Sequence, residues 1–302
     1  MINRKLIISL SLGGLILGGT FYIENHQIAF AKKNTNTVET KKENQQVVKS
    51  YSKEEIHYKI LNSIDYFQTV KGAFEEYNGA ISNIHSKVEY QVRVGNNPLA
   101  YSTIAMKDSN NVEQIHLFKD EILLTIYPER KEYGKSPVSV PKDSSEIDKS
   151  IEHRYAVGEK DVSNFLLRAD YPPLGPAESS IFNQAELINY LYNYNLWNIT
   201  NQDDLYLTRH VITIEGSLAG RVARITKGTT FKLWIDQETG VLLKKEIKNE
   251  KGDIVAYLKT KTFIVNKPIK DEEIKVGIPE DYKNGFEQNE QLIKRLEETK
   301  QK

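Results

Sequence analysis

The stretch from residue 229 to residue 266 constrains the fold of this chain more than any other part of it. Apolar and polar side chains alternate along three runs, whose apolar positions are Phe231, Leu233, Ile235, Val241, Leu243, Ile247, Ile254, Ala256, Leu258 and Ile264. A period of two is typical of a strand with one buried face. Turn-forming residues separate the runs at 237–240 and 249–253. The stretch therefore predicts an antiparallel meander whose apolar face needs a cover.

Earlier in the chain, residues 87–94 show the clearest alternation. Val88, Tyr90, Val92 and Val94 point to one face, and the polar side chains between them point to the other. Further strands are predicted at 99–106, 112–118, 122–127, 209–215 and 220–226. The early runs are joined by short connections, which indicates that consecutive strands are antiparallel neighbours.

Two helices are predicted beside these strands. Ser52 and Glu55 form a capping box, and a stripe of helical period follows at Ile56, Ile60, Leu61, Ile64 and Phe67. Asn183 is expected to cap a second helix that runs to about Trp197, with Leu187 and Leu191 on its apolar stripe. The prolines in 166–177 and the charged residues of 135–150 predict two long loops.

Two short patches resemble hairpins of a known group of envelope proteins. The first is FKLWID at 231–236, followed by ETG at 238–240 and two leucines. The second is FKD at 118–120 with IYPE at 126–129 and Tyr133. They resemble the hairpins of LolA-like lipoprotein carriers (outer-membrane lipoprotein-sorting proteins) and of the MucB/RseB N-terminal domain. The resemblance implies an α+β fold: a curved antiparallel sheet forming a half-open β-barrel, with helices covering its concave face.

The resemblance also implies a function. A carrier of this kind holds a lipid acyl chain or a lipidated peptide in an apolar cavity, without a cofactor and without catalysis. We expect the cavity to be lined by Val88, Tyr90, Val92, Leu124, Ile126, Leu187, Leu191, Phe231, Leu233, Ile235, Leu243 and Leu258. The alternative is a regulatory module of the MucB/RseB kind, which binds a membrane partner protein in envelope-stress signalling. Whether the cavity is open or filled by side chains stays undecided at this point, and we expect a monomer.

Composition excludes several other classes of protein. The chain has 302 residues with 41 basic and 41 acidic side chains, so its formal net charge is zero and nucleic-acid binding is not expected. It has no cysteine, which removes disulfides, thiol nucleophiles and a lipid-anchored cysteine. No two of its six histidines have the spacing of a helical zinc pair, and we expect them at the surface or at strand edges. Without a catalytic motif, a hydrolase assembled from scattered residues is the third and weakest hypothesis.

The N-terminus indicates export. Arg4 and Lys5 precede an uncharged apolar run at 6–23, and Ala29-Phe30-Ala31 supplies a small-x-small site. We expect a signal peptide at 1–31, cleaved after Ala31, with an uncleaved membrane anchor at 6–23 as the alternative. A flexible linker is predicted at 32–51, the half-barrel domain at 52–285 and a charged tail at 286–302.

Overall fold

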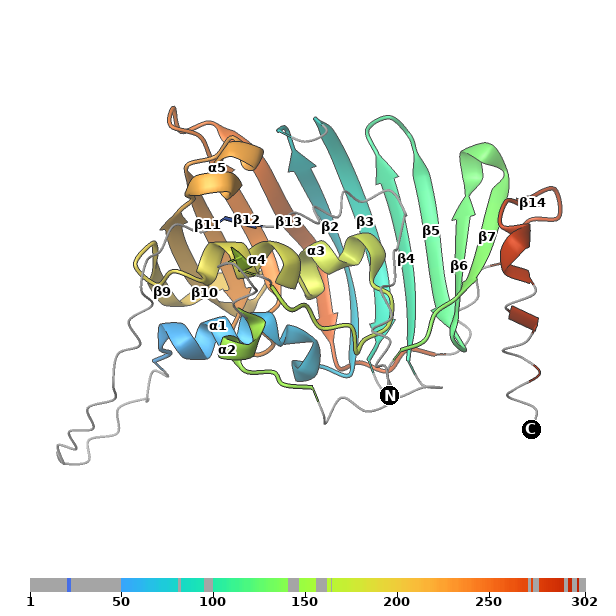
Figure 1. Cartoon of the computed structure of the whole chain (residues 1–302), viewed down its shortest axis with the longest axis horizontal. Helices are drawn as coiled ribbons and strands as arrows, with labels where there is room; N and C mark the ends of the chain where they lie inside the picture. Colours follow the sequence, from blue (N-terminus) through green and yellow to red (C-terminus); the bar gives the residue numbers. More distant parts are fainter. Residues whose placement is uncertain are drawn as a thin grey trace.

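Figure 1 shows the computed structural model, which describes residues 21–22, 50–80, 83–94, 100–140, 147–155, 162–163, 165–270, 273, 277–290, 293–294 and 298. Most of the predicted apolar run, the cleavage site at Ala31, nearly all of the predicted linker and part of the charged tail lie outside these residues. Within them, no helix has the length and apolar character needed to cross a membrane.

One large, open antiparallel sheet dominates the molecule. Its order is β14-β7-β6-β5-β4-β3-β2-β13-β12-β11-β10-β9, and only the β14–β7 pair is parallel. The bounds are β2 (Thr69–Asn78), β3 (Ile84–Arg93), β4 (Tyr101–Asp108), β5 (Glu113–Lys119), β6 (Ile122–Tyr127), β7 (Glu132–Pro137), β9 (Trp197–Tyr206), β10 (Arg209–Ser217), β11 (Thr230–Asp236), β12 (Leu242–Lys248), β13 (Ile254–Val265) and β14 (Lys283–Asn284). A separate two-stranded sheet pairs β1 (Phe21–Tyr22) with β8 (Val162–Ser163).

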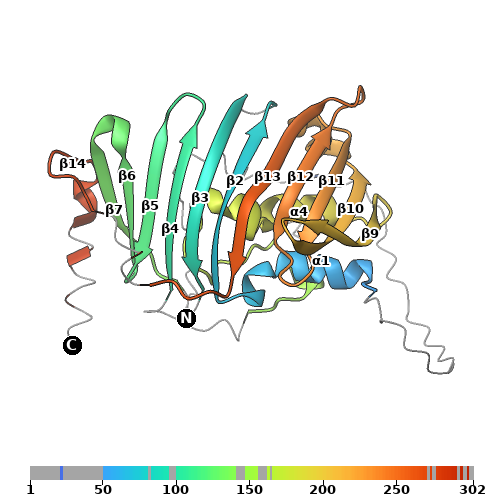
Figure 2. The ribbon, with the colours of Figure 1, turned by 180° about the vertical axis from the view of Figure 1, so that it is seen from behind.

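Most of the helices lie across the concave face of the large sheet, as the two opposite views show (Figures 1 and 2). The helix bounds are α1 (Lys53–Leu61), α2 (Ile151–Arg154), α3 (Glu178–Ile181), α4 (Gln184–Leu191) and α5 (Gly220–Thr226), with 3₁₀ turns η1 (Ser63–Tyr66), η2 (Pro128–Arg130), η4 (Gly175–Ala177) and η6 (Glu287–Asn289). Ser52 and Glu55 form the expected capping box at the start of α1. The predicted α+β half-barrel architecture is confirmed.

The two meanders are joined by a long-range pairing. Strands β2 to β7 follow one another in sequence, and so do β9 to β13. Strand β13 then pairs antiparallel with β2 from Ala256↔Asn78 to Val265↔Val70. The chain between the meanders crosses the concave face, where Ile56 and Ile60 of α1 and Leu187 of α4 share a buried cluster with the strands. The sheet and its cover therefore come from interleaved parts of the chain.

Two predicted elements are corrected by the structure. The second helix ends at Leu191 rather than near Trp197, because residues 193–196 form a turn in which Leu196 N donates to Asn193 O at 3.0 Å. Residues 220–226, predicted as a strand, form α5. Strands β10 and β11 already pair up to Ser217↔Thr230, so this segment has no strand beside it, and Val222 and Ala223 pack against the buried cluster instead.

The turn that carries the family resemblance is fixed by a buried carboxylate. Asp236 is fully buried and accepts bonds from Arg209 Nε at 2.7 Å, Thr239 N at 2.8 Å and Thr239 Oγ1 at 2.7 Å. Gly240 has a φ of 75°, and a Cβ there would lie 2.6 Å from the carbonyl oxygen of Lys59 in the last turn of α1. The turn residues thus serve to place this hairpin against α1.

A pair of glycine substitutions tests this close approach. Gly240→Ala and Gly252→Ala both place alanine at positive φ, which costs roughly 1–2 kcal/mol. A Cβ at Gly252 meets nothing within 4 Å, whereas a Cβ at Gly240 meets the α1 backbone. We expect urea denaturation to show a clearly larger loss of unfolding free energy for Gly240→Ala. Equal losses would mean that the hairpin does not press against α1.

Candidate functional site

The structure brings most of the predicted lining residues together in two buried clusters. One cluster includes α1 and α4 and contains Leu187, Leu191, Phe231, Leu233 and Ile235. The other includes α3 and contains Val88, Tyr90, Val92, Leu243 and Leu258. These side chains lie on the buried faces of their strands and of α4.

Leu124 and Ile126 do not join the other ten. Ile126 pairs with Ile115, which pairs with Ala105, which pairs with Glu89. Directly paired residues share a face, so Ile126 and Leu124 lie on the side of Glu89 and not on that of Tyr90. Because the sequence of β6 is apolar at nearly every position, its pattern does not show which side chains lie on the concave face. The tight turn at Asp120 and Glu121, both at positive φ, is the signal that sets the register.

The trough is defined here as the surface formed by Phe74, Val88, Tyr90, Ile104, Leu258 and Thr260. Thr260 pairs with Phe74 and Phe74 with Val88, while Ile104 pairs with Tyr90, so these residues share one face of β2, β3, β4 and β13. Residues 171–182, called the crossing segment, contain η4 and α3 and contact β3, β4 and β12.

Side chains of the crossing segment fill the apolar part of the trough. Leu174, Ala177, Ile181 and Phe182 are each at most 1% exposed and belong to the same buried cluster as Val88. The ring of Tyr171 packs edge-on against Phe182, with centroids 4.8 Å apart. The sequence left undecided whether the cavity is open or filled. In this structure the trough is filled by side chains of the crossing segment.

Several polar atoms in and beside the trough have no hydrogen-bond partner within the described part of the protein. They are Tyr90 Oη, Thr260 Oγ1 and His116 Nε2, all buried. Tyr90 Oη lies near the Ser180 hydroxyl, which itself donates to Leu242 O at 2.9 Å. Burial raises the pKa of Tyr90 and lowers the pKa of His116. Buried polar groups of an ordinary core are nearly always satisfied, so this surface has unused bonding capacity.

A buried ion pair joins α4 to the row of residues next to the trough. Lys245 pairs across the strands with Leu258, and Leu258 with Glu76. Lys245 Nζ donates to both carboxylate oxygens of Glu186 at 2.6 and 2.7 Å. Burial by itself would raise the pKa of Glu186, but Lys245, Tyr190 and Asn183 outweigh it and lower that pKa. Burial raises the pKa of Glu76, which Lys245 and Ser179 only partly oppose.

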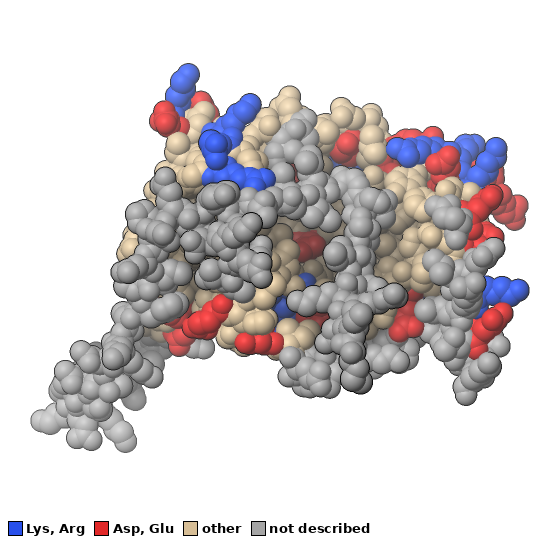
Figure 3. All heavy atoms as spheres, in the orientation of Figure 1, with Lys and Arg blue, Asp and Glu red and all other residues tan. Residues whose placement is uncertain are grey.

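In the sequence, Lys245 falls on the same row as Leu243 and Ile247, but nothing in the pattern identifies Glu186 and Glu76 as its neighbours. The signal was present, because a buried lysine needs a buried partner. Which carboxylate would supply the charge depends on how α4 crosses the sheet. In the space-filling view, a hollow in this face holds both acidic and basic side chains (Figure 3).

A second polar network holds the beginning of the crossing segment. Arg168 is buried and binds Asp65 at 2.6 and 2.7 Å and Asp170 at 2.7 and 2.8 Å. Arg154 donates to the carbonyl oxygens of Leu61 at 3.2 Å and Leu166 at 2.9 Å. These bonds attach the chain just before the crossing segment to η1 and to the end of α1.

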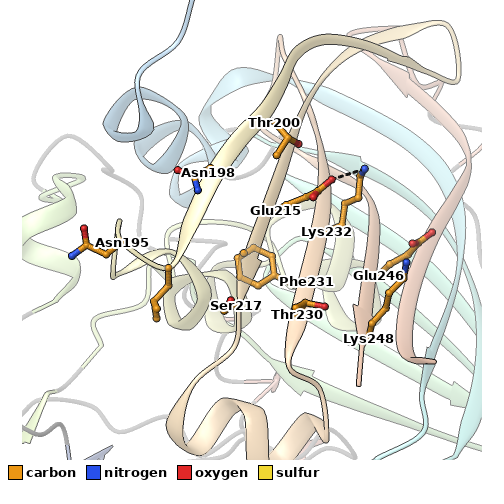
Figure 4. A pocket seen from close by; sticks show the side chains of 12 residues that line it. Asn195, Asn198, Thr200, Glu215, Ser217, Thr230, Phe231, Lys232, Glu246 and Lys248 are labelled. Carbon is orange, nitrogen blue, oxygen red and sulfur yellow. Dashed lines mark ion pairs between the residues drawn. The ribbon is translucent and has the colours of Figure 1, made fainter. Parts of the chain in front are cut away.

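An open groove lies elsewhere on the sheet, with a volume of about 610 Å³ (Figure 4). Its lining is mainly polar and includes Glu215, Lys232 and Glu246, which are paired across β10, β11 and β12. Lys232 and Glu215 form an ion pair at 2.7 Å. Because this row alternates with Leu233, the polar lining lies on the other face from the buried clusters, and only the edge of the groove reaches Phe231 of the cluster with α4. The groove is distinct from the trough.

The histidines include two that contradict the surface expectation. His57 is 1% exposed, between the hydroxyls of Tyr155 at 2.8 Å and Tyr194 at 3.1 Å, and His116 is 8% exposed. Burial lowers the pKa of His57 to about 3. Within the described part of the chain, no group of three His, Asp or Glu side chains could hold a metal ion.

Comparison with known proteins gives likenesses of fold. No protein-family model matches the chain, and no curated protein matches it. Among solved structures it is similar to MucB in the MucA/MucB complex of Pseudomonas aeruginosa, with 13% identity over 73% of this chain and 61% of that one and a TM-score of 0.39. The lipoprotein LppX of Mycobacterium tuberculosis shares 11% identity over 71% and 97% of the two chains, with a TM-score of 0.33.

A LolA-superfamily protein of Nitrosomonas europaea shares 12% identity over 72% of this chain and 96% of that chain, with a TM-score of 0.25. The chain spans about 61% of the length of the MucB chain that it matches. These likenesses concern the fold alone. The names of these structures include the LolA-like and MucB proteins whose hairpins the two sequence patches resemble.

The ion pair beside the trough gives a testable stability effect. Lys245→Met leaves Glu186 partly buried without its cation, and we expect a loss of about 3–5 kcal/mol in unfolding free energy. The double variant Lys245→Met/Glu186→Gln should lose less than the single variant, because no unpaired charge remains. Lys244→Met, at the neighbouring lysine paired with Glu246 on the other face, is the control and should cost within about 1 kcal/mol. Additive losses in the double variant would contradict the pairing.

His57 gives a dependence on pH. Its pKa is about 3 in the folded protein against an ordinary 6.5, so between these values the unfolded chain binds one more proton at this position. Stability must therefore fall as the pH falls through this window. From pH 7 to pH 5, protonation of His57 in the unfolded chain should lower the unfolding free energy by roughly 2 kcal/mol. We expect urea titrations at pH 7 and pH 5 to show that His57→Gln removes this part of the pH dependence of the unfolding free energy. His153→Gln, at an exposed histidine, is the control and should keep it. An unchanged pH dependence in His57→Gln would contradict the prediction.

Proposed function

We propose that the protein is an exported, non-enzymatic binding protein that takes the acyl chain of a lipid or lipidated peptide into the trough. The crossing segment occupies the trough in the absence of ligand and leaves it when the acyl chain enters. The basic residues Arg4 and Lys5 and the apolar run behind them support export. This function requires no cofactor.

One observation carries the proposal: the trough is apolar, yet buried polar atoms beside its apolar side chains are unsatisfied. A surface formed only to be core would leave neither Thr260 Oγ1 nor His116 Nε2 without a partner in the described part of the chain. A ligand with an apolar chain and a polar group close to it satisfies both features. The row holding Lys245 and Glu76 adds charged groups beside the trough, where a polar end can lie.

The energetics permit an exchange between the crossing segment and a ligand. Each buried CH₂ of an acyl chain contributes about 0.8 kcal/mol, so a long chain can offset the side chains that it displaces. The crossing segment contains η4, with three residues, and α3, with four. Helices this short have little stability of their own and depend on packing against the sheet. The segment is therefore the part of the cover that can leave with few backbone bonds broken.

Phe182 distinguishes a displaceable cover from an ordinary core. Phe182→Ala should cost about 3–5 kcal/mol of unfolding free energy, but it should increase acyl-chain affinity, because it removes a competitor for the trough. Phe231→Ala is the matched control: Phe231 is also buried, at 2% exposure, but in the cluster with α4. It should destabilise the protein without increasing affinity. Titration with a fluorescent fatty acid, under conditions where both variants are folded, measures the difference.

The milder Phe182→Leu gives the same test if the alanine variant does not fold. Equal or weaker fatty-acid binding by both Phe182 variants would contradict the proposal. Native mass spectrometry of protein purified from its host adds a direct check, since lipid should co-purify. Capture of a membrane protein by cross-linking in intact cells, with no lipid bound, would favour the regulatory module of the MucB/RseB kind.

A further inference from the structure

The connection between β10 and β11 is longer than a hairpin of this sheet requires. The two strands pair without interruption up to Ser217↔Thr230, and the twelve residues between them form α5 and its flanks. The other turns of the second meander are short, as between Asp236 and Leu242 or Lys248 and Ile254.

The insertion is held firmly at the end of the strands. Leu218 N donates to Thr229 O at 2.8 Å, and Thr229 N donates to Lys248 O at 2.7 Å. Gly228 lies so close to β12 that a Cβ would meet Ile247 Cγ2 at 2.2 Å. Val222 and Ala223 pack against the buried cluster of α4 and the strands. The apolar side of α5 is therefore already used, and the other side faces outward in a fixed position.

The outward side is basic. Between residues 217 and 229 the chain has three basic residues, Arg221, Arg224 and Lys227, and no acidic one, although the whole chain has a net charge of zero. Arg224 and Lys227 are exposed. In Figure 3, Lys and Arg side chains gather over α5 at the upper edge of the molecule. The next turn, at Glu250 to Asp253, carries both signs of charge and does not extend the basic surface.

We infer that α5 docks the protein on the surface of an anionic lipid bilayer. Arg224 and Lys227 are exposed at the end of the sheet, while the apolar side of α5 packs against the core. A planar array of lipid phosphates matches such a projecting surface, and each basic side chain near it strengthens binding by about fivefold. The contact is electrostatic and does not require α5 to insert, because its apolar side remains packed.

Co-sedimentation with lipid vesicles tests this inference on the full exported chain isolated from its host. We expect more binding to vesicles of phosphatidylcholine with roughly 30% phosphatidylglycerol, which carry a strong negative surface charge, than to phosphatidylcholine alone. Added salt should weaken the difference. Arg224→Gln/Lys227→Gln should reduce the partition coefficient for anionic vesicles by at least about tenfold. Binding that is equal in parent and variant and independent of lipid charge would come from the N-terminal apolar run and would contradict the inference.

The matched control is Lys107→Gln/Lys119→Gln, which makes the same change in net charge at two exposed lysines of β4 and β5. It should bind anionic vesicles within about twofold of the parent. Thermal unfolding verifies that both double variants are folded. Equal binding by the two double variants, or binding of the parent to a soluble polyanion without binding to vesicles, would overturn the inference.

Discussion

The pairing of β13 with β2 is the interaction on which the rest of the structure depends. These strands stand at opposite ends of the folded chain, and their register runs from Ala256↔Asn78 to Val265↔Val70. The pairing converts two local meanders into one wide sheet with a shared concave face. One layer of short helices can then cover both halves, because the chain between the meanders has to cross that face.

The cover is attached by ion pairs at a few points. Arg168 with Asp65 and Asp170 holds one end, and Lys245 with Glu186 holds α4 to the sheet. Buried ion pairs contribute little net stability because of their desolvation cost, but breaking one is expensive, so they specify where the cover lies. Between these points, the crossing segment depends mainly on apolar contacts and on short helices, with single hydroxyl bonds such as that of Ser180 to Leu242 O. The helices that cover the sheet are therefore attached unevenly, and the more weakly attached part, the crossing segment, lies over the trough.

This arrangement separates the functional regions of the molecule. The cluster under α1 and α4 is a packed core, while the trough combines apolar surface with unsatisfied polar atoms. The basic helix α5 stands at the end of the strands beside the core cluster, so a contact made there would leave the crossing segment uncovered. The proposed exchange of an acyl chain would use both regions, the crossing segment as a cover that leaves and α5 as the contact with the bilayer.

The sequence by itself determined the strand-rich α+β architecture, the capping box of α1, the alternation of β3 and the buried face of β11, because these follow from local periodicity and turn chemistry. In β13 the predicted face was right only in part: Ala256 and Leu258 are buried, but Ile254 and Ile264 are exposed, and a register shift between Thr260 and Thr262 puts Ile264 on the other face. Only the tertiary structure decided the rest. The run of β6 is apolar on both faces, so the pattern could not show on which face Leu124 and Ile126 lie. The strand register places them on the face away from the trough. Residues 220–226 fit either a strand or a helix, and the completed β10–β11 pairing left them helical. Glu186 contacts Lys245 because α4 crosses the sheet, and Glu76 lies near Lys245 because β13 pairs with β2. No local sequence signal encodes contacts between such distant segments.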